Sequence, residues 1–142
     1  MAKLIPQLSA IDVDGYVRFL SEAFGFEVIS TWRDPNDPID VNVEVEFQGV
    51  VVGIGRRRVA HRAAKDPAAP NVGLYVIVDD VDAHYRRACS ARAKVIWDIA
   101  DQPFGHRMYA AADPEGYEWC FATPLSDKNG PPLRSAAAEP RR

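Results

Sequence analysis

The chain has 142 residues, of which 47% are hydrophobic and 26% are charged. This is the composition of an ordinary globular protein, and the length suffices for one hydrophobic core. The formal net charge is −3, from 17 basic and 20 acidic residues. A chain without excess positive charge lacks the field that holds nucleic acids or anionic membrane surfaces, so we expect neither as a partner.

Cysteine content and the N-terminal segment bear on the compartment. Cys89 and Cys120 are the two cysteines, too few for a disulfide framework. Pro6 and several polar residues interrupt the first dozen positions, so neither a signal peptide nor a membrane-spanning segment is predicted. We therefore expect a soluble cytoplasmic protein.

The first half predicts a strand, a helix and three further strands. Asp12 is a suitable N-cap for the helix, apolar residues follow it at helical spacing, and Gly25 stands where a left-handed residue is favoured after a helix. Gln48 and Gly49 predict a tight turn between the last two strands. The predicted strands cover residues 4–11, 26–32, 41–47 and 50–54, with a loop at residues 34–40.

The second half repeats this order. A strand is predicted at residues 72–78, a helix at residues 81–91, and strands near Val95, Met108 and Trp119. Asp12-Val13-Asp14 aligns with Asp80-Val81-Asp82 at an offset of 68 positions, since 80 minus 12 is 68. This match favours an internal repeat. The alternative is that any two strand-to-helix turns favour aspartate and valine at these places.

The predicted fold is therefore α/β of the α+β kind, with two βαβββ modules. We expect one domain over residues 1–125, with modules at about residues 3–57 and 71–124 and a polar connector at residues 56–70. Residues 126–142 are rich in proline, alanine and charge and predict a flexible tail.

The most specific motif is Asp113-Pro114-Glu115-Gly116. Proline presets φ at the second position of a turn, and glycine accepts positive φ before the final strand. Together with the preceding residues 101–109 and with Ala23-Phe24-Gly25-Phe26, this motif resembles the glyoxalase and bleomycin-resistance proteins of the vicinal oxygen chelate superfamily. The resemblance implies curved mixed sheets around a cavity, and dimers in which halves pair to close the site.

The resemblance also implies positions for a divalent metal. Enzymes of this superfamily hold it with His, Gln or Glu side chains from the first and fourth strands of each half. The matching positions are Ile5, Gly73, Cys120 and either Val52 or Gly53. Because these residues do not form a set of metal ligands, no metal site is predicted.

One alternative to a metal-free protein stays open. A slip of one residue near Gln7, Glu44, Glu46 or Glu118 would return oxygen donors to the inner face. The three histidines, His61, His84 and His106, fall in the connector, the second helix and the approach to a strand, and none is assigned a catalytic role.

A concave pocket remains possible without a metal, and aromatic walls suit planar ligands. Arg107 could clamp a carboxylate, or it could pair with Asp113 or Glu118. Aromatic residues in strands also commonly belong to the core. The candidate ligand-binding residues are Trp32, Phe47, Tyr75, Trp97, Phe104, Arg107, Tyr109, Trp119 and Cys120.

The predicted function is metal-independent binding of a small hydrophobic, planar or antibiotic-like molecule, with sequestration rather than turnover and with no cofactor. We expect a homodimer. The alternative is a lyase, isomerase or dioxygenase in which a divalent metal polarises vicinal oxygens of the substrate. A third hypothesis is a dimeric interaction module.

Overall fold

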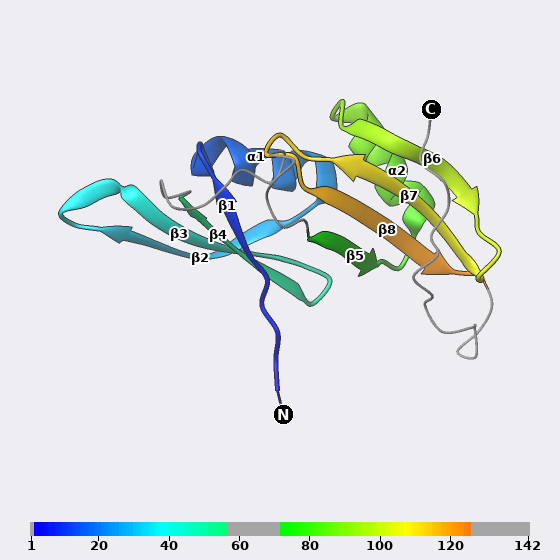
Figure 1. Cartoon of the computed structure of the whole chain (residues 1–142), viewed down its shortest axis with the longest axis horizontal. Helices are drawn as coiled ribbons and strands as arrows, with labels where there is room; N and C mark the ends of the chain where they lie inside the picture. The colour runs from blue at the N-terminus through cyan, green and yellow to red at the C-terminus, as the bar shows by residue number, and fades with distance from the viewer. Residues whose placement is uncertain (1, 57–71, 126–142) are drawn as a thin grey trace.

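The computed structural model describes residues 2–56 and 72–125 (Figure 1). The predicted α+β class is confirmed. The expectations for residues 57–70 and 126–142 lie outside the described residues. The elements are β1 (Gln7–Ala10), α1 (Val13–Phe24), β2 (Glu27–Asp34), β3 (Asp37–Phe47), β4 (Val50–Arg56), β5 (Gly73–Ile77), α2 (Val81–Ser90), β6 (Lys94–Asp101), β7 (His106–Ala112) and β8 (Glu118–Pro124).

Two four-stranded sheets share one topology. The first sheet has the strand order β1-β4-β3-β2 and the second has the order β5-β8-β7-β6. In each sheet the first and fourth strands of the half are parallel, and the other neighbours are antiparallel. The two βαβββ modules predicted from the repeat are therefore present.

The two helices begin in the same way. The side chain of Asp12 accepts the N–H of Gly15, and the side chain of Asp80 accepts the N–H of Ala83. Each aspartate thus satisfies one of the free N–H groups of the first turn. Gly25 has φ of 85° and ends α1 as predicted. Neither helix in the described part of the chain is long and apolar enough to cross a membrane.

The predicted loop at residues 34–40 is wrong, because β3 begins at Asp37 and only Pro35 and Asn36 separate it from β2. The N–H of Asn36 bonds to the Asp34 carboxylate at 2.8 Å, which closes a tight hairpin. Pro38 is tolerated in a strand here because this end of β3 has only β2 as a neighbour. The first strand is also shorter than the predicted residues 4–11.

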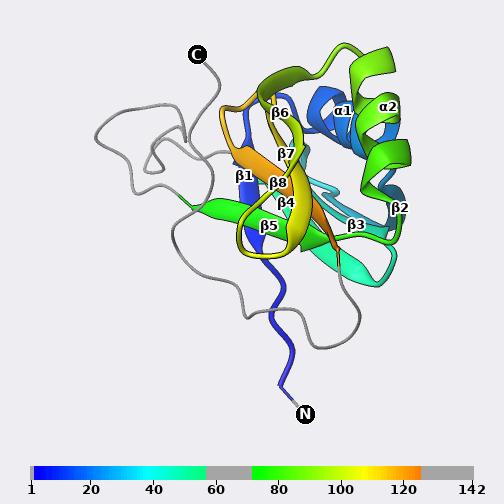
Figure 2. The ribbon, with the colours of Figure 1, turned by 90° about the vertical axis from the view of Figure 1, so that its right-hand side faces the viewer.

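One core joins both halves. The two helices lie side by side (Figure 2) and contact each other. The Phe24 ring of α1 lies 5.5 Å from Trp119 and 4.8 Å from Phe121, both in β8. His84 of α2 lies 5.3 Å from Phe47 of β3. Each sheet therefore has a helix-side face in this common core, and we call the opposite face of each sheet its open face.

A buried carboxylate links the two halves at the Asp-Pro-Glu-Gly turn. Asp113 is 6% exposed, and its carboxylate accepts hydrogen bonds from the Tyr16 hydroxyl at 2.5 Å and the Trp119 indole at 2.8 Å. It also accepts the backbone N–H groups of Glu115 and Tyr117. Burial raises the pKa of Asp113, although these four donors oppose the shift.

Asp113→Asn should lower the free energy of unfolding by about 2 kcal/mol, because an amide has one acceptor oxygen and leaves a buried donor without a partner. Tyr16→Phe removes one donor and should cost about 1 kcal/mol. Denaturant unfolding of the two variants and of the double variant measures both losses and their coupling. Wild-type stability of Asp113→Asn would show that this junction does not hold the halves together.

His84 makes a second buried connection between the halves. Its Nε2 donates to the carbonyl oxygen of Phe24 at 2.8 Å, because a carbonyl can only accept. Its Nδ1 therefore accepts the hydroxyl of Tyr109 at 2.6 Å. Nδ1 can accept because the imidazole is neutral at pH 7, since burial lowers the pKa of His84 to about 4.

The low pKa of His84 predicts acid sensitivity. Between the ordinary histidine pKa of 6.5 and the folded value of about 4, the unfolded chain binds the proton and the folded chain does not. Stability should therefore fall as pH drops through this window, by about 3 kcal/mol for this group. Melting temperatures measured from pH 7 to 4 test this, and His84→Gln should flatten the profile in that range.

Candidate functional site

The open face of the second sheet carries a row of four residues across its four strands. Trp97 of β6 is opposite Ala110 of β7, Ala110 is opposite Cys120 of β8, and Cys120 is opposite Tyr75 of β5. Strands lie about 4.8 Å apart, so about 14 Å separates the two outer strands. Two aromatic side chains therefore stand on either side of a floor of small residues.

Tyr75 leans across this floor. Its hydroxyl lies 2.8 Å from Nδ1 of His106 and 3.9 Å from the sulfur of Met108, both in β7. Met108 is only 1% exposed. Ala122 of β8, the strand between β5 and β7, is 0% exposed. Phe104 adds an edge-on ring 5.6 Å from that of His106. An aromatic cluster thus forms at this end of the sheet.

The Tyr75 hydroxyl and the Cys120 thiol of this face are uncharged at neutral pH. Burial raises the pKa of the Cys120 thiol to about 11, and burial with the nearby Cys120 raises the pKa of the Tyr75 hydroxyl to about 12. The thiol is therefore a poor nucleophile. The buried indole N–H of Trp97 has no hydrogen-bond partner among the described residues.

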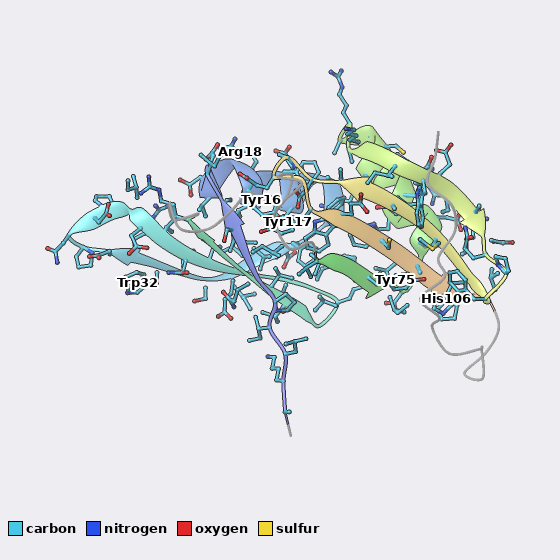
Figure 3. All side chains as sticks on the ribbon, viewed as in Figure 1. Tyr16, Arg18, Trp32, Tyr75, His106 and Tyr117 are labelled. Atoms are coloured by element: carbon cyan, nitrogen blue, oxygen red, sulfur yellow. The ribbon has the colours of Figure 1, made fainter. Side chains whose placement is uncertain are left out.

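The open face of the first sheet is polar instead. Gln7 of β1 is opposite Gly53 of β4, and Gly53 is opposite Glu44 of β3. The Gln7 side chain lies over Gly53, where a Cβ atom would meet it. Trp32 of β2 is on the same face, opposite Asn42. Figure 3 shows Trp32 at one end of the molecule, with Tyr75 and His106 near the other.

A comparison with known families agrees with this architecture. The sequence profile of the glyoxalase/bleomycin resistance protein/dioxygenase superfamily matches residues 6–121. The chain belongs to this superfamily. The match covers both modules, including the Asp-Pro-Glu-Gly turn.

Individual relatives are more distant. An uncharacterised protein of Mycobacterium bovis is 35% identical over 65 residues, which is 46% of this chain and 43% of that protein. The chain therefore matches less than half of the length of this curated relative. TioX from Micromonospora sp. ML1 superposes with a TM-score of 0.72 at 25% identity, over 88% of this chain and all of that one. A glyoxalase I mutant of Zea mays has a TM-score of 0.64 at 15% identity, over 85% of this chain and 47% of that one, and shows the shared fold.

The superfamily member described here places some predicted ligand-binding residues together and separates others. Tyr75, Trp97 and Cys120 share the open face of the second sheet, with Phe104 in the turn beside it. Trp32 belongs to the open face of the first sheet and is 52% exposed. Ligand contact by these residues stays a prediction.

The other candidates lie on the helix side, which corrects the sequence expectation for them. Tyr109 and Trp119 are 0% exposed, so their side chains have no surface left for a ligand. Phe47 packs against Phe26 and His84. Strand alternation placed the rings of Tyr109 and Trp119 in the core and left Phe47 partly buried against it.

Arg107 also has other partners than expected. Its guanidinium bonds to Asp82 at 3.1 Å and to Asp101 at 3.0 Å, rather than to Asp113 or Glu118. Asp113 is buried in the core, where the Tyr16 hydroxyl and the Trp119 indole donate hydrogen bonds to it. A guanidinium with two carboxylate partners on the helix side is not placed to clamp a ligand on the open face.

The described histidine and cysteine side chains do not supply a site for the superfamily's divalent metal. Within residues 2–56 and 72–125, no group of three His, Cys, Asp or Glu side chains is close enough to hold a cation. His84 is enclosed in the core, and Nδ1 of His106 is bonded to Tyr75. The Cys120 thiol resists the deprotonation that ligation requires. His61 lies outside the described residues.

Sequence reasoning missed the contact between Tyr75 and His106. The two residues are 31 positions apart and lie on β5 and β7, which are separated by β8 in the sheet. Only the strand order and register bring them together. Alternation along residues 106–112 could have placed His106, Met108 and Ala110 on one face, but not opposite Tyr75.

Proposed function

We propose that this protein is a cytoplasmic, metal-independent binding protein that holds a small planar hydrophobic molecule on the open face of its second sheet. The observation that carries the proposal is the row of Trp97, Ala110, Cys120 and Tyr75. Aromatic side chains on both sides of a small-residue floor offer stacking surfaces. The four residues of the row are neutral and add no charge that a hydrophobic ligand would have to desolvate.

Binding of a neutral bicyclic probe, 2-naphthol, tests the proposal. It should saturate and quench tryptophan fluorescence, because Trp97 lies at the site. Tyr75→Leu and Trp97→Leu should each weaken binding about tenfold, since each removes one stacking surface worth about 1.4 kcal/mol.

Tyr85→Leu is the matched control, because Tyr85 is a partly buried tyrosine on α2 that packs against the helix-side core. It should leave the affinity unchanged. Treatment with EDTA, or addition of Zn²⁺, Ni²⁺ or Mn²⁺, should also have no effect. Equal losses in Tyr75→Leu and Tyr85→Leu would refute the site, and metal-dependent binding or turnover would favour the enzyme alternative.

We further propose that two copies pair so that the open faces are covered. The helices of one chain fill only the helix-side faces, and large apolar side chains remain exposed on β2 and elsewhere. Val28 is 52% exposed, Ile29 is 51% exposed and Trp32 is 52% exposed. Exposed side chains of this size favour an interface at β2. A partner's sheet over the second sheet would enclose the ligand.

Sedimentation velocity should show a homodimer. Trp32→Glu should shift the protein toward monomer, because it places a charge in the covered open face. Thr31→Glu is the control, since Thr31 is an exposed neighbour on the other face of β2. A wild-type monomer at micromolar concentration, or equal effects of the two substitutions, would contradict the pairing.

A further inference from the structure

A separate cavity lies on the helix side of the first sheet, away from both open faces. It has a volume of about 230 Å³. The start of α1 forms one wall and the β2–β3 hairpin forms another. Its lining residues are Ile11, Asp12, Val13, Asp14, Arg33, Pro38, Ile39, Val41 and Arg56.

Strand register explains the position of the two arginines. Arg33 of β2 is opposite Val41 of β3, and Arg56 of β4 is opposite Ala10 of β1. Because Asn42 is opposite Gly55 in an antiparallel pair, Val41 lies beside Arg56. Arg33 and Arg56 are therefore level with each other across the first sheet, on either side of the buried Val41.

The apolar part of the cavity is only partly covered by protein. Val13 and Val41 are 5% and 3% exposed and belong to the core. Ile11 and Ile39 are 59% and 57% exposed at the cavity wall. A hydrocarbon group placed here would remove these two side chains from water, which is favourable.

The four charged residues of the cavity are not equivalent. Arg33 pairs with Asp14 at 3.0 Å and also donates to the carbonyl oxygen of Pro38. Asp12 accepts the N–H of Gly15, where its charge also suits the positive end of α1. Arg56 has no ion pair or hydrogen bond within the described residues. Among the described residues, the cavity therefore offers one cationic group without a partner, Arg56, beside an apolar wall.

We propose that this cavity binds a small apolar carboxylate. Its carboxylate pairs with Arg56, and its hydrocarbon part covers Ile11 and Ile39. A guanidinium binds a carboxylate through two parallel hydrogen bonds, which distinguishes an acid from its neutral amide. The size of the cavity suits a fragment-sized molecule rather than the larger ligands of typical pockets. This site does not depend on the proposed function of the open face.

Titration of the whole chain with 4-methylpentanoate at pH 7, followed by methyl NMR, tests the proposal. The methyl signals of Ile11, Val13, Ile39 and Val41 should shift together, and that of Met108 on the open face should not. The neutral 4-methylpentanamide should bind about tenfold more weakly, because it lacks the charge-assisted pair.

Arg56→Gln should weaken binding of the acid about tenfold, and Arg56→Lys should retain most of it because the charge remains. Arg18→Gln is the control, since Arg18 is an exposed arginine elsewhere on α1. Equal affinity for acid and amide in the wild-type protein would overturn the proposal even if a variant failed to fold. Shifts confined to Met108, or wild-type binding by Arg56→Gln, would also overturn it.

Discussion

The buried carboxylate of Asp113 is the point on which the arrangement of the two halves depends. It lies in the second half, yet the Tyr16 hydroxyl that it accepts comes from the helix of the first half. Such a group is stable in the core only while its donors are in place. His84 also joins the two halves, because its Nε2 in the second helix donates a hydrogen bond to the Phe24 carbonyl at the end of the first helix. These contacts hold the two helices side by side. The helix-side faces of the sheets therefore contribute to the stability of the fold.

The open faces are consequently free to differ, and the repeated halves have diverged there. The offset of 68 positions places Gln7 of the first half at the position of Tyr75 in the second. Gln7 is opposite Gly53, whereas Tyr75 is opposite Cys120. Equivalent places in the two sheets therefore carry an amide over glycine in one case and a phenol beside a thiol in the other. If two copies pair, a polar surface and an aromatic surface can meet around one ligand.

Much of the fold could be predicted from local chemistry. Asp12 and Gly25 mark the limits of α1 because capping and left-handed backbone are properties of single residues. The sequence predicts a loop instead of the hairpin at residues 35–36, because two prolines close together, Pro35 and Pro38, usually indicate a loop. The site was harder to predict, since the face on which an aromatic residue lies depends on strand register. Trp119 and Cys120 are adjacent in sequence, yet one is in the core and the other faces outward.

The shifted pKa values also bear on the kind of chemistry that the molecule supports. A catalytic acid or base works best when its pKa lies near the working pH. Burial moves three pKa values away from neutral pH in this protein. It lowers the pKa of His84 to about 4 and raises the pKa of Cys120 to about 11 and that of Tyr75 to about 12. Each shift favours the neutral form at physiological pH. These shifts disfavour proton transfer by the three residues near pH 7. The neutral Tyr75 and Cys120 side chains of the open face instead suit contact with an apolar molecule by buried area and stacking.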